Sequence, residues 1–275
     1  MCTFFALQSH ENVILDDIIL MDMYNIEISN TFPLAIVTGA AHRLGNSFAL
    51  HLARMGYAIV LHYFQSHEKA DFAAGEIRKL GVPVFPIHAD LISDAGCTEL
   101  FDFIDRLQTN EKKNSYSLKV MVNSSAVMPR GDAKTLSMAE FDAAIALNLR
   151  APFICSQMAY RRMENGGIII NISDIASQKS WLGYPAYTIS KAGLDSMTRI
   201  LARSFAPKVR VNAISPGLVL KSDSHNSEDW DRLVNRLPLQ RAASLAELNG
   251  ALEFLIKNEY ITGQTIVIDG GYSML

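Results

Sequence analysis

Short apolar runs alternate along the chain with longer segments whose apolar residues recur at helical spacing. The runs that predict β-strands are Leu34–Val37, Ala58–Leu61, Val84–His88, Lys119–Val122, Gly167–Ile172, Val209–Ile214 and Thr265–Ile268. Helices are predicted between them at 46–55, 97–107, 137–163 and 187–205, with another near 244. Strands that are apolar almost throughout and are separated by helices are typical of a parallel sheet covered on both faces.

Local signals locate some of the element ends. Ser137 with Glu140, and Ser244 with Glu247, have the spacing of a capping box, so a helix should begin after each serine. Pro86 lies inside the third apolar run and cannot donate a ladder hydrogen bond. That strand should therefore end there or lie at an edge of the sheet.

The pattern predicts an α/β fold: a single doubly wound, Rossmann-like domain over residues 33–275, with a seven-stranded parallel sheet and helices on both faces. No linker rich in Pro, Gly or Ser divides this stretch, and it contains no internal repeat. In such sheets ligands bind beyond the carboxyl ends of the strands. Motifs at strand ends are therefore the candidates for chemistry.

Residues 1–32 differ from the rest of the chain. They contain acidic residues but no Lys or Arg, so they match neither a secretory signal nor a mitochondrial presequence. We expect a loosely ordered N-terminal extension, or a start codon assigned too early, with Met21 or Met23 as alternatives.

Composition narrows the class of protein. With 49% hydrophobic and 19% charged residues among 275, the chain is not intrinsically disordered. A net charge of −3 gives no indication of nucleic-acid binding, and no apolar stretch is long enough to span a membrane. The widely spaced Cys2, Cys97 and Cys155 form neither a disulfide framework nor a metal-binding pattern. We expect a cytoplasmic protein without a metal that acts on a small molecule.

The first strand leads into a glycine turn, Thr38–Gly45, which contains Gly39, Arg43 and Leu44. Such a turn lets backbone N–H groups and a helix N-terminus approach a diphosphate, although an ordinary tight turn has the same residues. The second strand ends without the acidic residue that would bind the ribose 2′-hydroxyl of NAD. Arg43 and Ser66 would instead favour a 2′-phosphate, so we predict NADP(H), with Tyr63 beside it.

Asp90 and Leu91 follow the third strand. The Asp90 carboxylate would accept a hydrogen bond from an adenine amino group. A turn or helix cap is an equally good interpretation of an aspartate at this place.

Tyr187 and Lys191 are four residues apart in a predicted helix, so they lie on one helix face. An ammonium beside a phenol favours the phenolate, and the pKa of Tyr187 should therefore fall toward the working pH. This suits Tyr187 to general acid catalysis. Lys191 would also reach the nicotinamide ribose.

Taken together, these motifs resemble those of the short-chain dehydrogenases/reductases over residues 33–275. The residues that carry the resemblance are Asn123, Asn148, Tyr187 with Lys191, Pro216–Gly217, Ile261–Gly263 and Asp269–Gly271. The resemblance implies that Asn123 and the following Ser124 and Ser125 support the cofactor site, and that Pro216 and Gly217 pack by the nicotinamide. It implies that Asn148 holds a water linking Lys191 to solvent. Members of the family commonly pair the helices at about 140–163 and 187–205 into dimers and tetramers, so a homo-oligomer is expected.

The chain departs from the family at two positions. Arg43 replaces a third glycine in the phosphate loop, and Asp174 stands where the family has its catalytic serine, while Ser173 faces the opposite way in an extended strand. An ionised carboxylate would repel a developing alkoxide, but it suits a substrate that offers N–H donors or needs a proton at a ring nitrogen. The alternative is a structural cap in an inactive enzyme.

Both departures resemble the pteridine reductases and the bacterial dihydromonapterin/dihydrofolate reductases of this fold, as do Leu61–Tyr63, Gly183–Tyr187 and Asp269–Ser273. This resemblance implies that Arg43 serves both the cofactor phosphate and the substrate, and that Tyr184 helps form a pterin pocket. Met128 replaces a stacking phenylalanine of the protozoan enzymes, and Ser125 would bind a ring nitrogen. Trp230, in the 218–240 segment, either covers the ligand or packs on a short helix.

We therefore expect an NADPH-dependent reductase that transfers a hydride to a dihydropterin or dihydrofolate. Asp174, Tyr187, Lys191 and Asn148 are the expected catalytic residues. One alternative is a carbonyl reductase of the 3-oxoacyl or steroid type, and another is a non-catalytic NADP(H)-binding regulator.

Overall fold

A computed structural model of the chain describes residues 30–109, 114–221 and 226–275. These residues form a seven-stranded sheet in the order β3-β2-β1-β4-β5-β6-β7, with all strands parallel. The strands are β1 (Asn30–Val37), β2 (Ala58–Tyr63), β3 (Val84–His88), β4 (Asn114–Asn123), β5 (Gly167–Ile172), β6 (Val209–Pro216) and β7 (Thr265–Ile268). The predicted fold class is confirmed.

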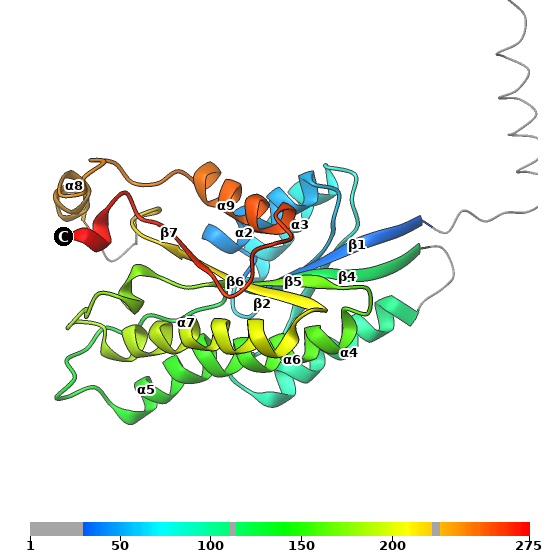
Figure 1. Cartoon of the computed structure of the whole chain (residues 1–275), viewed down its shortest axis with the longest axis horizontal. Coiled ribbons are helices and arrows are strands. Elements are labelled where there is room, and N and C mark those ends of the chain that lie inside the picture. Colours follow the sequence, from blue (N-terminus) through cyan, green and yellow to red (C-terminus); the bar gives the residue numbers. More distant parts are fainter. Residues whose placement is uncertain (1–29, 110–113, 222–225) are drawn as a thin grey trace, which may run out of the picture.

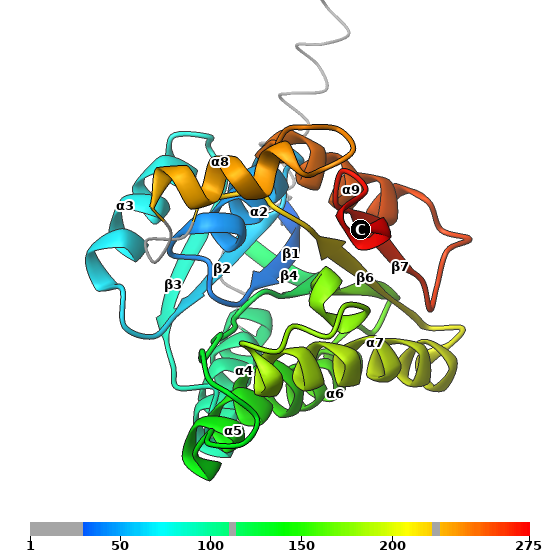
Figure 2. The ribbon, with the colours of Figure 1, turned by 90° about the vertical axis from the view of Figure 1, so that its left-hand side faces the viewer.

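Helices cover both faces of the sheet (Figures 1 and 2). One layer contains α4 (Asp94–Thr109), α5 (Met138–Ile145), α6 (Ala151–Arg162) and α7 (Pro185–Phe205). The other contains α2 (Arg43–Arg54), α3 (His67–Arg78) and α9 (Leu245–Lys257), with α8 (Ser227–Asn235) above it. Within the described residues, none of the helices has the length and apolarity needed to cross a membrane.

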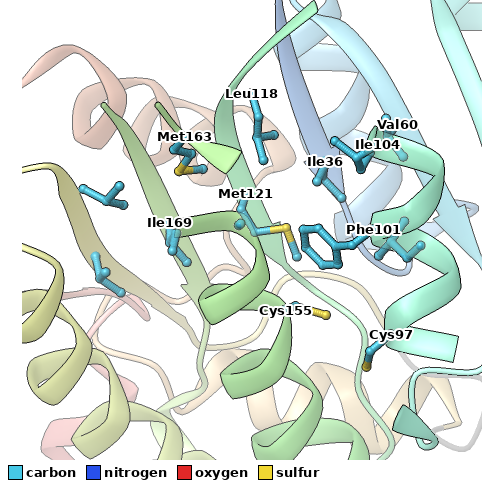
Figure 3. Close-up of a cluster of buried hydrophobic side chains, with 14 of the residues drawn as sticks. Ile36, Val60, Cys97, Phe101, Ile104, Leu118, Met121, Cys155, Met163 and Ile169 are labelled. Atoms are coloured by element: carbon cyan, nitrogen blue, oxygen red, sulfur yellow. The ribbon is translucent and has the colours of Figure 1, made fainter. Parts of the chain in front are cut away.

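Alternate side chains of the central strands enter two separate cores. Ile36 of β1 packs with α4 and α6 residues such as Phe101 and Cys155, as Figure 3 shows, whereas Val37 packs on the α2 side. Cys97 and Cys155 are buried free thiols in the first core. Burial on both faces explains why the strands are apolar almost throughout.

The two capping boxes are confirmed. Ser137 caps α5 and Ser244 caps α9, each with reciprocal bonds to a glutamate three residues on. The single helix predicted from Ser137 to Met163 is present, but a π-helical turn, η1 (Ala146–Arg150), interrupts it between α5 and α6. A π-turn adds a residue to the local helical repeat and is frequent at functional sites.

The structure corrects some element boundaries. β1 begins at Asn30, so residues 30–32 belong to the sheet rather than to the predicted extension, whose remaining residues lie outside the described part. β3 is an edge strand, as Pro86 indicated. The apolar pattern did not predict α3, whose buried face consists of Ala70, Ala73, Ala74 and Ile77. Small side chains at helical spacing give a weaker hydrophobic signal than large ones.

Candidate active site

A cavity of about 890 Å³ lies at the carboxyl ends of the strands, where the doubly wound topology predicts a ligand site. Most of the predicted site residues line it: Gly39, Arg43, Leu44, Tyr63, Ser66, Asp90, Leu91, Ser124, Ser125, Met128, Asp174, Tyr184, Tyr187, Lys191, Pro216, Gly217 and Trp230. Asn123 and Asn148 do not line this cavity.

The turn after β1 fits a diphosphate. Gly39 has a left-handed backbone (φ +65°), and a Cβ at Gly45 would lie 2.3 Å from the Gly39 carbonyl oxygen. Only glycine allows this close approach between the turn and the first turn of α2. Because both residues line the cavity, the start of α2 lies beside it and offers N–H groups to an anion.

Arg43 also has a positive φ, +53°, which is uncommon for a side chain of its size. Its guanidinium donates to the carbonyl oxygens of Leu220 at 3.0 Å and Lys221 at 3.2 Å. Arg43 therefore ties the phosphate loop to the segment that follows β6, a contact that the sequence did not indicate.

The part of the cavity beside the ends of β2 and β3 carries polar groups. Ser66 and Tyr63 line it, with no carboxylate among the cavity residues of 62–66. Oδ1 of Asp90 accepts a hydrogen bond from the backbone N–H of Ile92 at 3.0 Å, as a turn-capping aspartate does. One oxygen of Asp90 thus has the capping role, while the residue still faces the cavity.

The Tyr187 hydroxyl donates a 2.9 Å hydrogen bond to Oδ2 of Asp174. Oδ1 of Asp174 accepts from the backbone N–H of Ala176 at 2.8 Å and so caps the 3₁₀ turn η2 (Ile175–Ser177). The capping function and the contact with Tyr187 therefore coexist on one carboxylate. Burial raises the pKa of Asp174 above its ordinary value.

Lys191 is almost completely buried, and its Nζ donates to the Ile172 carbonyl oxygen at 2.7 Å. The same ammonium lies 5.6 Å from the centroid of the Tyr187 ring. Burial lowers the pKa of Lys191 to about 8, although the charges of Asp174 and Asp195 oppose the shift.

The predicted fall in the pKa of Tyr187 is wrong. Burial, followed by the charge of Asp174 and the hydrogen bond to it, raises the pKa of Tyr187 well above its ordinary value. The helix spacing correctly places Lys191 beside the phenol ring. Its ammonium is directed to the end of β5, however, and the phenol proton is held by a carboxylate instead.

Asn148 and Asn123 stabilise the surroundings of the cavity. The Asn148 side chain accepts from the Val127 N–H and donates to the Val127 carbonyl, both at 2.8 Å, and also donates to Ser190. It thereby fixes the segment after β4 that carries Ser125 and Met128. The predicted water relay through Asn148 is not tested by these contacts. Asn123 donates to Asn171 and Ser156 inside the structure.

Two side chains that help to position the segments after β1 and β4 were not predicted from the sequence. Nδ1 of His62 accepts from the Gly39 N–H at 3.2 Å, and its Nε2 lies 3.0 Å from the Ala89 carbonyl oxygen. Burial lowers the pKa of His62 to about 4, so it stays neutral. Oγ1 of Thr38 accepts from the N–H groups of Ser124 and Ser125. The Thr-Gly pair before a predicted helix was the available signal for Thr38.

Ser173 is a further polar group at the cavity. Its Oγ is buried without a hydrogen-bond partner within the described residues, although Ser173 lines the cavity. Trp181 and Tyr272 also line the cavity and were not predicted. Trp230 lies on α8, which agrees with the short-helix alternative, and it faces the cavity too. In the described part of the chain, His, Cys, Asp and Glu form no cluster that could hold a metal ion.

Comparisons with known proteins agree with the observed fold. A family model described as enoyl-(acyl carrier protein) reductase matches residues 39–273. The 3-oxoacyl-(acyl-carrier-protein) reductase FabG of Staphylococcus aureus is 32% identical over 247 residues, which cover 87% of this chain and 98% of the relative. The 1-cyclohexenylcarbonyl-CoA reductase of Streptomyces collinus is 31% identical and covers 88% of this chain, with 87% of its own length matched.

Among solved structures, the FolM alternative dihydrofolate reductase 1 of Brucella suis, in complex with NADP, superposes with a TM-score of 0.80. It is 30% identical, and the match covers 88% of this chain and 95% of that one.

Proposed function

Because the chain belongs to the short-chain dehydrogenase/reductase family, we propose that this NADP(H)-dependent oxidoreductase reduces a pterin-like substrate, such as a dihydropterin or a dihydrofolate. The observation that carries the substrate class is the 2.9 Å hydrogen bond between Tyr187 and Asp174. A carboxylate at this point accepts N–H donors, which an aminopyrimidine ring presents and a 3-oxoacyl chain lacks.

The residues present fit NADP(H). The close Gly39–Gly45 turn and the start of α2 would hold the diphosphate, and Arg43 with Ser66 would hold the 2′-phosphate. Lys191 and the unpartnered Ser173 hydroxyl would face the nicotinamide end. When bound in its reduced form, the cofactor supplies a hydride.

The residues of the chain would supply the proton. Reduction of a C=N bond adds a hydride to carbon and a proton to nitrogen. Tyr187 holds a proton at its hydroxyl oxygen and, because its pKa is raised, keeps it until a ring nitrogen accepts it. Asp174, whose pKa is raised too, would take a proton from solvent and return it to Tyr187. The Lys191 charge would compensate the Asp174 carboxylate between turnovers.

The substrate would bind at the end of the cavity that contains Asp174 and Tyr187. Ser125 and Met128 line it on the β4 side, and Tyr184 and Trp230 line it from other segments. The Met128 thioether would contact a flat ring more weakly than a stacked aromatic side chain does.

A second candidate is a carbonyl reductase of the 3-oxoacyl type, which the 32% identity to FabG favours. An NADPH-oxidation assay with 7,8-dihydrobiopterin, dihydromonapterin, dihydrofolate and an acetoacetyl thioester distinguishes the two. We expect turnover of a pterin substrate. Turnover of the thioester alone would establish the second candidate. Tight NADPH binding with no turnover of any substrate would indicate a non-catalytic regulator.

We also propose that the protein forms a homo-oligomer through α6 and α7. These helices expose apolar side chains, among them Phe153, Ile189 and Ile200. Cys155 of α6 points into the core and would not take part in the contact. Light scattering combined with gel filtration measures the mass, and a monomer at micromolar concentration would contradict the proposal.

A further inference from the structure

An aromatic wall borders the cavity and is formed in part by the loop between Asp174 and Tyr187. It consists of Trp181, Tyr184 and Tyr272, all of which line the cavity. The ring centroids of Trp181 and Tyr184 are 6.2 Å apart, and those of Trp181 and Tyr272 are 6.3 Å apart. Rings separated by roughly 4.5–7 Å attract one another, so the wall is a connected set of side chains.

The wall joins two distant parts of the sequence. Trp181 and Tyr184 lie in the loop between η2 and α7, whereas Tyr272 opens the 3₁₀ turn η3 (Tyr272–Met274) after β7. The Asp269 carboxylate accepts from the N–H groups of Gly271 at 2.9 Å and Ser273 at 2.7 Å. This fixes the form of the turn, but it does not attach the turn to the loop of Trp181.

Lys179 makes that attachment. Its Nζ donates to the Tyr272 carbonyl oxygen at 2.9 Å and to a Leu275 oxygen at 2.6 Å, and it lies 5.0 Å from the Tyr272 ring centroid. The Lys179 backbone N–H donates to the Ile175 carbonyl at 3.0 Å, so its own position is set by the turn that follows Asp174. Lys179 is not among the cavity-lining residues. It can therefore act on the contacts of a ligand through the residues it holds.

We propose that Lys179 is a positioning residue that holds Tyr272 in the aromatic wall, and that this wall selects a flat conjugated ring over a flexible acyl chain. The inference rests on the proposed function and identifies residues that determine its substrate class. A planar heteroaromatic ring gains contact with several ring faces and edges at once. A flexible acyl chain has no π-system and loses rotational freedom when it is held against the same surface.

Steady-state kinetics with NADPH and 7,8-dihydrobiopterin tests the inference. Lys179→Met and Tyr272→Leu should each raise KM about 3- to 10-fold, the equivalent of one lost aromatic contact, while kcat stays within about 2-fold. The double variant should be no worse than either single variant, because both changes remove the same contact. Tyr272→Phe keeps the ring and should retain the original KM. Lys79→Met, which removes an exposed ammonium on the end of α3, is the matched control.

Several results would overturn the inference. They are an unchanged KM in Lys179→Met, a loss confined to kcat, or a further rise in KM when Lys179→Met is added to Tyr272→Leu. NADPH affinity, measured by titration, should be the same in all variants. If Lys179→Met does not fold, Tyr272→Leu compared with Tyr272→Phe still decides whether the ring matters.

A binding measurement separates this inference from the proposed reaction. The chain has two tryptophans, and in a Trp230→Phe background Trp181 is the remaining tryptophan, which excitation at about 295 nm selects over the tyrosines. Addition of 7,8-dihydrobiopterin should quench it, and Lys179→Met should weaken that binding about 3- to 10-fold. Pterin binding that is weakened by Lys179→Met, without pterin turnover, would contradict the proposed function and support the role of the aromatic wall. Pterin turnover with binding unaffected by Lys179→Met would support the function and refute the wall.

Discussion

The Tyr187 hydroxyl donates a hydrogen bond to Oδ2 of Asp174, 2.9 Å away, while the nearby ammonium of Lys191 donates to the Ile172 carbonyl oxygen. The pair sits on the wall of the cavity with the proton between its two oxygens. A carboxylate that accepts this hydrogen bond also repels an oxyanion at the same place. The charge at Asp174 is therefore the property that should decide activity and substrate class.

Asp174→Asn should lower kcat for 7,8-dihydrobiopterin about 10²-fold, in the range for loss of one proton-transfer group. The amide keeps an oxygen that can cap Ala176, so the fold should be retained. Stopped-flow or steady-state NADPH oxidation measures the effect. Asp71→Asn, at an exposed position of α3, is the charge-matched control. Asp174→Ser should lose the pterin activity and gain acetoacetyl thioester reduction, and an Asp174→Asn enzyme of full activity would exclude the proposed role.

The activity should depend on pH through Lys191 and Asp174. The folded-state pKa of Lys191 is about 8, below its ordinary value, so the ammonium is present below this pH and is lost above it. The raised pKa of Asp174 means that its carboxylate is lost as the pH falls, at a higher pH than for a free aspartate. kcat/KM should therefore fall on both sides of a maximum below about pH 8.

The fall of kcat/KM at alkaline pH needs a control, because another group could titrate in the same pH range. Contact with Cys155 lowers the pKa of the Cys97 thiol, which lies in the core rather than at the cavity. Cys97→Ala should leave the profile unchanged, whereas Lys191→Arg should move the alkaline limb upward. The raised pKa of Tyr187 keeps it protonated throughout. An alkaline limb that shifts in Cys97→Ala would refute its assignment to Lys191.

Replacement of Arg43 should reduce the preference for NADPH. Arg43→Gly removes the cation and suits the left-handed backbone, so the turn itself should be kept. NADPH affinity should fall about 10- to 100-fold, the equivalent of a charge-assisted hydrogen bond, while NADH affinity stays within about 2-fold. Isothermal titration with both cofactors measures this. An equal loss for both would mean that Arg43 acts only by tying down the segment at Leu220 and Lys221.

Gly45→Ala should destabilise the fold and weaken cofactor binding, because the added Cβ would overlap the Gly39 carbonyl in the phosphate loop. Gly75→Ala on α3 is the matched control, since a Cβ there meets open space. It should stabilise the protein by about 0.5–1 kcal/mol through helix propensity. Thermal unfolding and NADPH titration measure both changes, and similar effects of the two substitutions would contradict the tight-turn interpretation.

The sequence alone determined the layered fold and the location of the site. A parallel sheet must bury both faces of its central strands, so apolar runs separated by helical periodicity leave few other architectures. The glycine turn after β1 and the four-residue spacing of Tyr187 and Lys191 depend only on neighbouring residues. Both are therefore present in the structure as the sequence predicted them. The absence of an acidic residue after β2 likewise predicted NADP(H). An acid at that strand end would repel the 2′-phosphate, because ligands bind beyond the strand ends.

Only the tertiary structure decided where the polar groups point. Whether Lys191 bonds to Tyr187 or to Ile172, and whether Asp174 meets the phenol, depend on how the end of β5 packs against α7. The pKa of Tyr187 was mispredicted because burial and the carboxylate outweigh a cation that the spacing only placed nearby. The contact of Lys179 with Tyr272 joins segments that lie far apart in the chain, and no periodicity encodes such a pairing. It arises because the crossover connections of the sheet bring strand ends together at one edge.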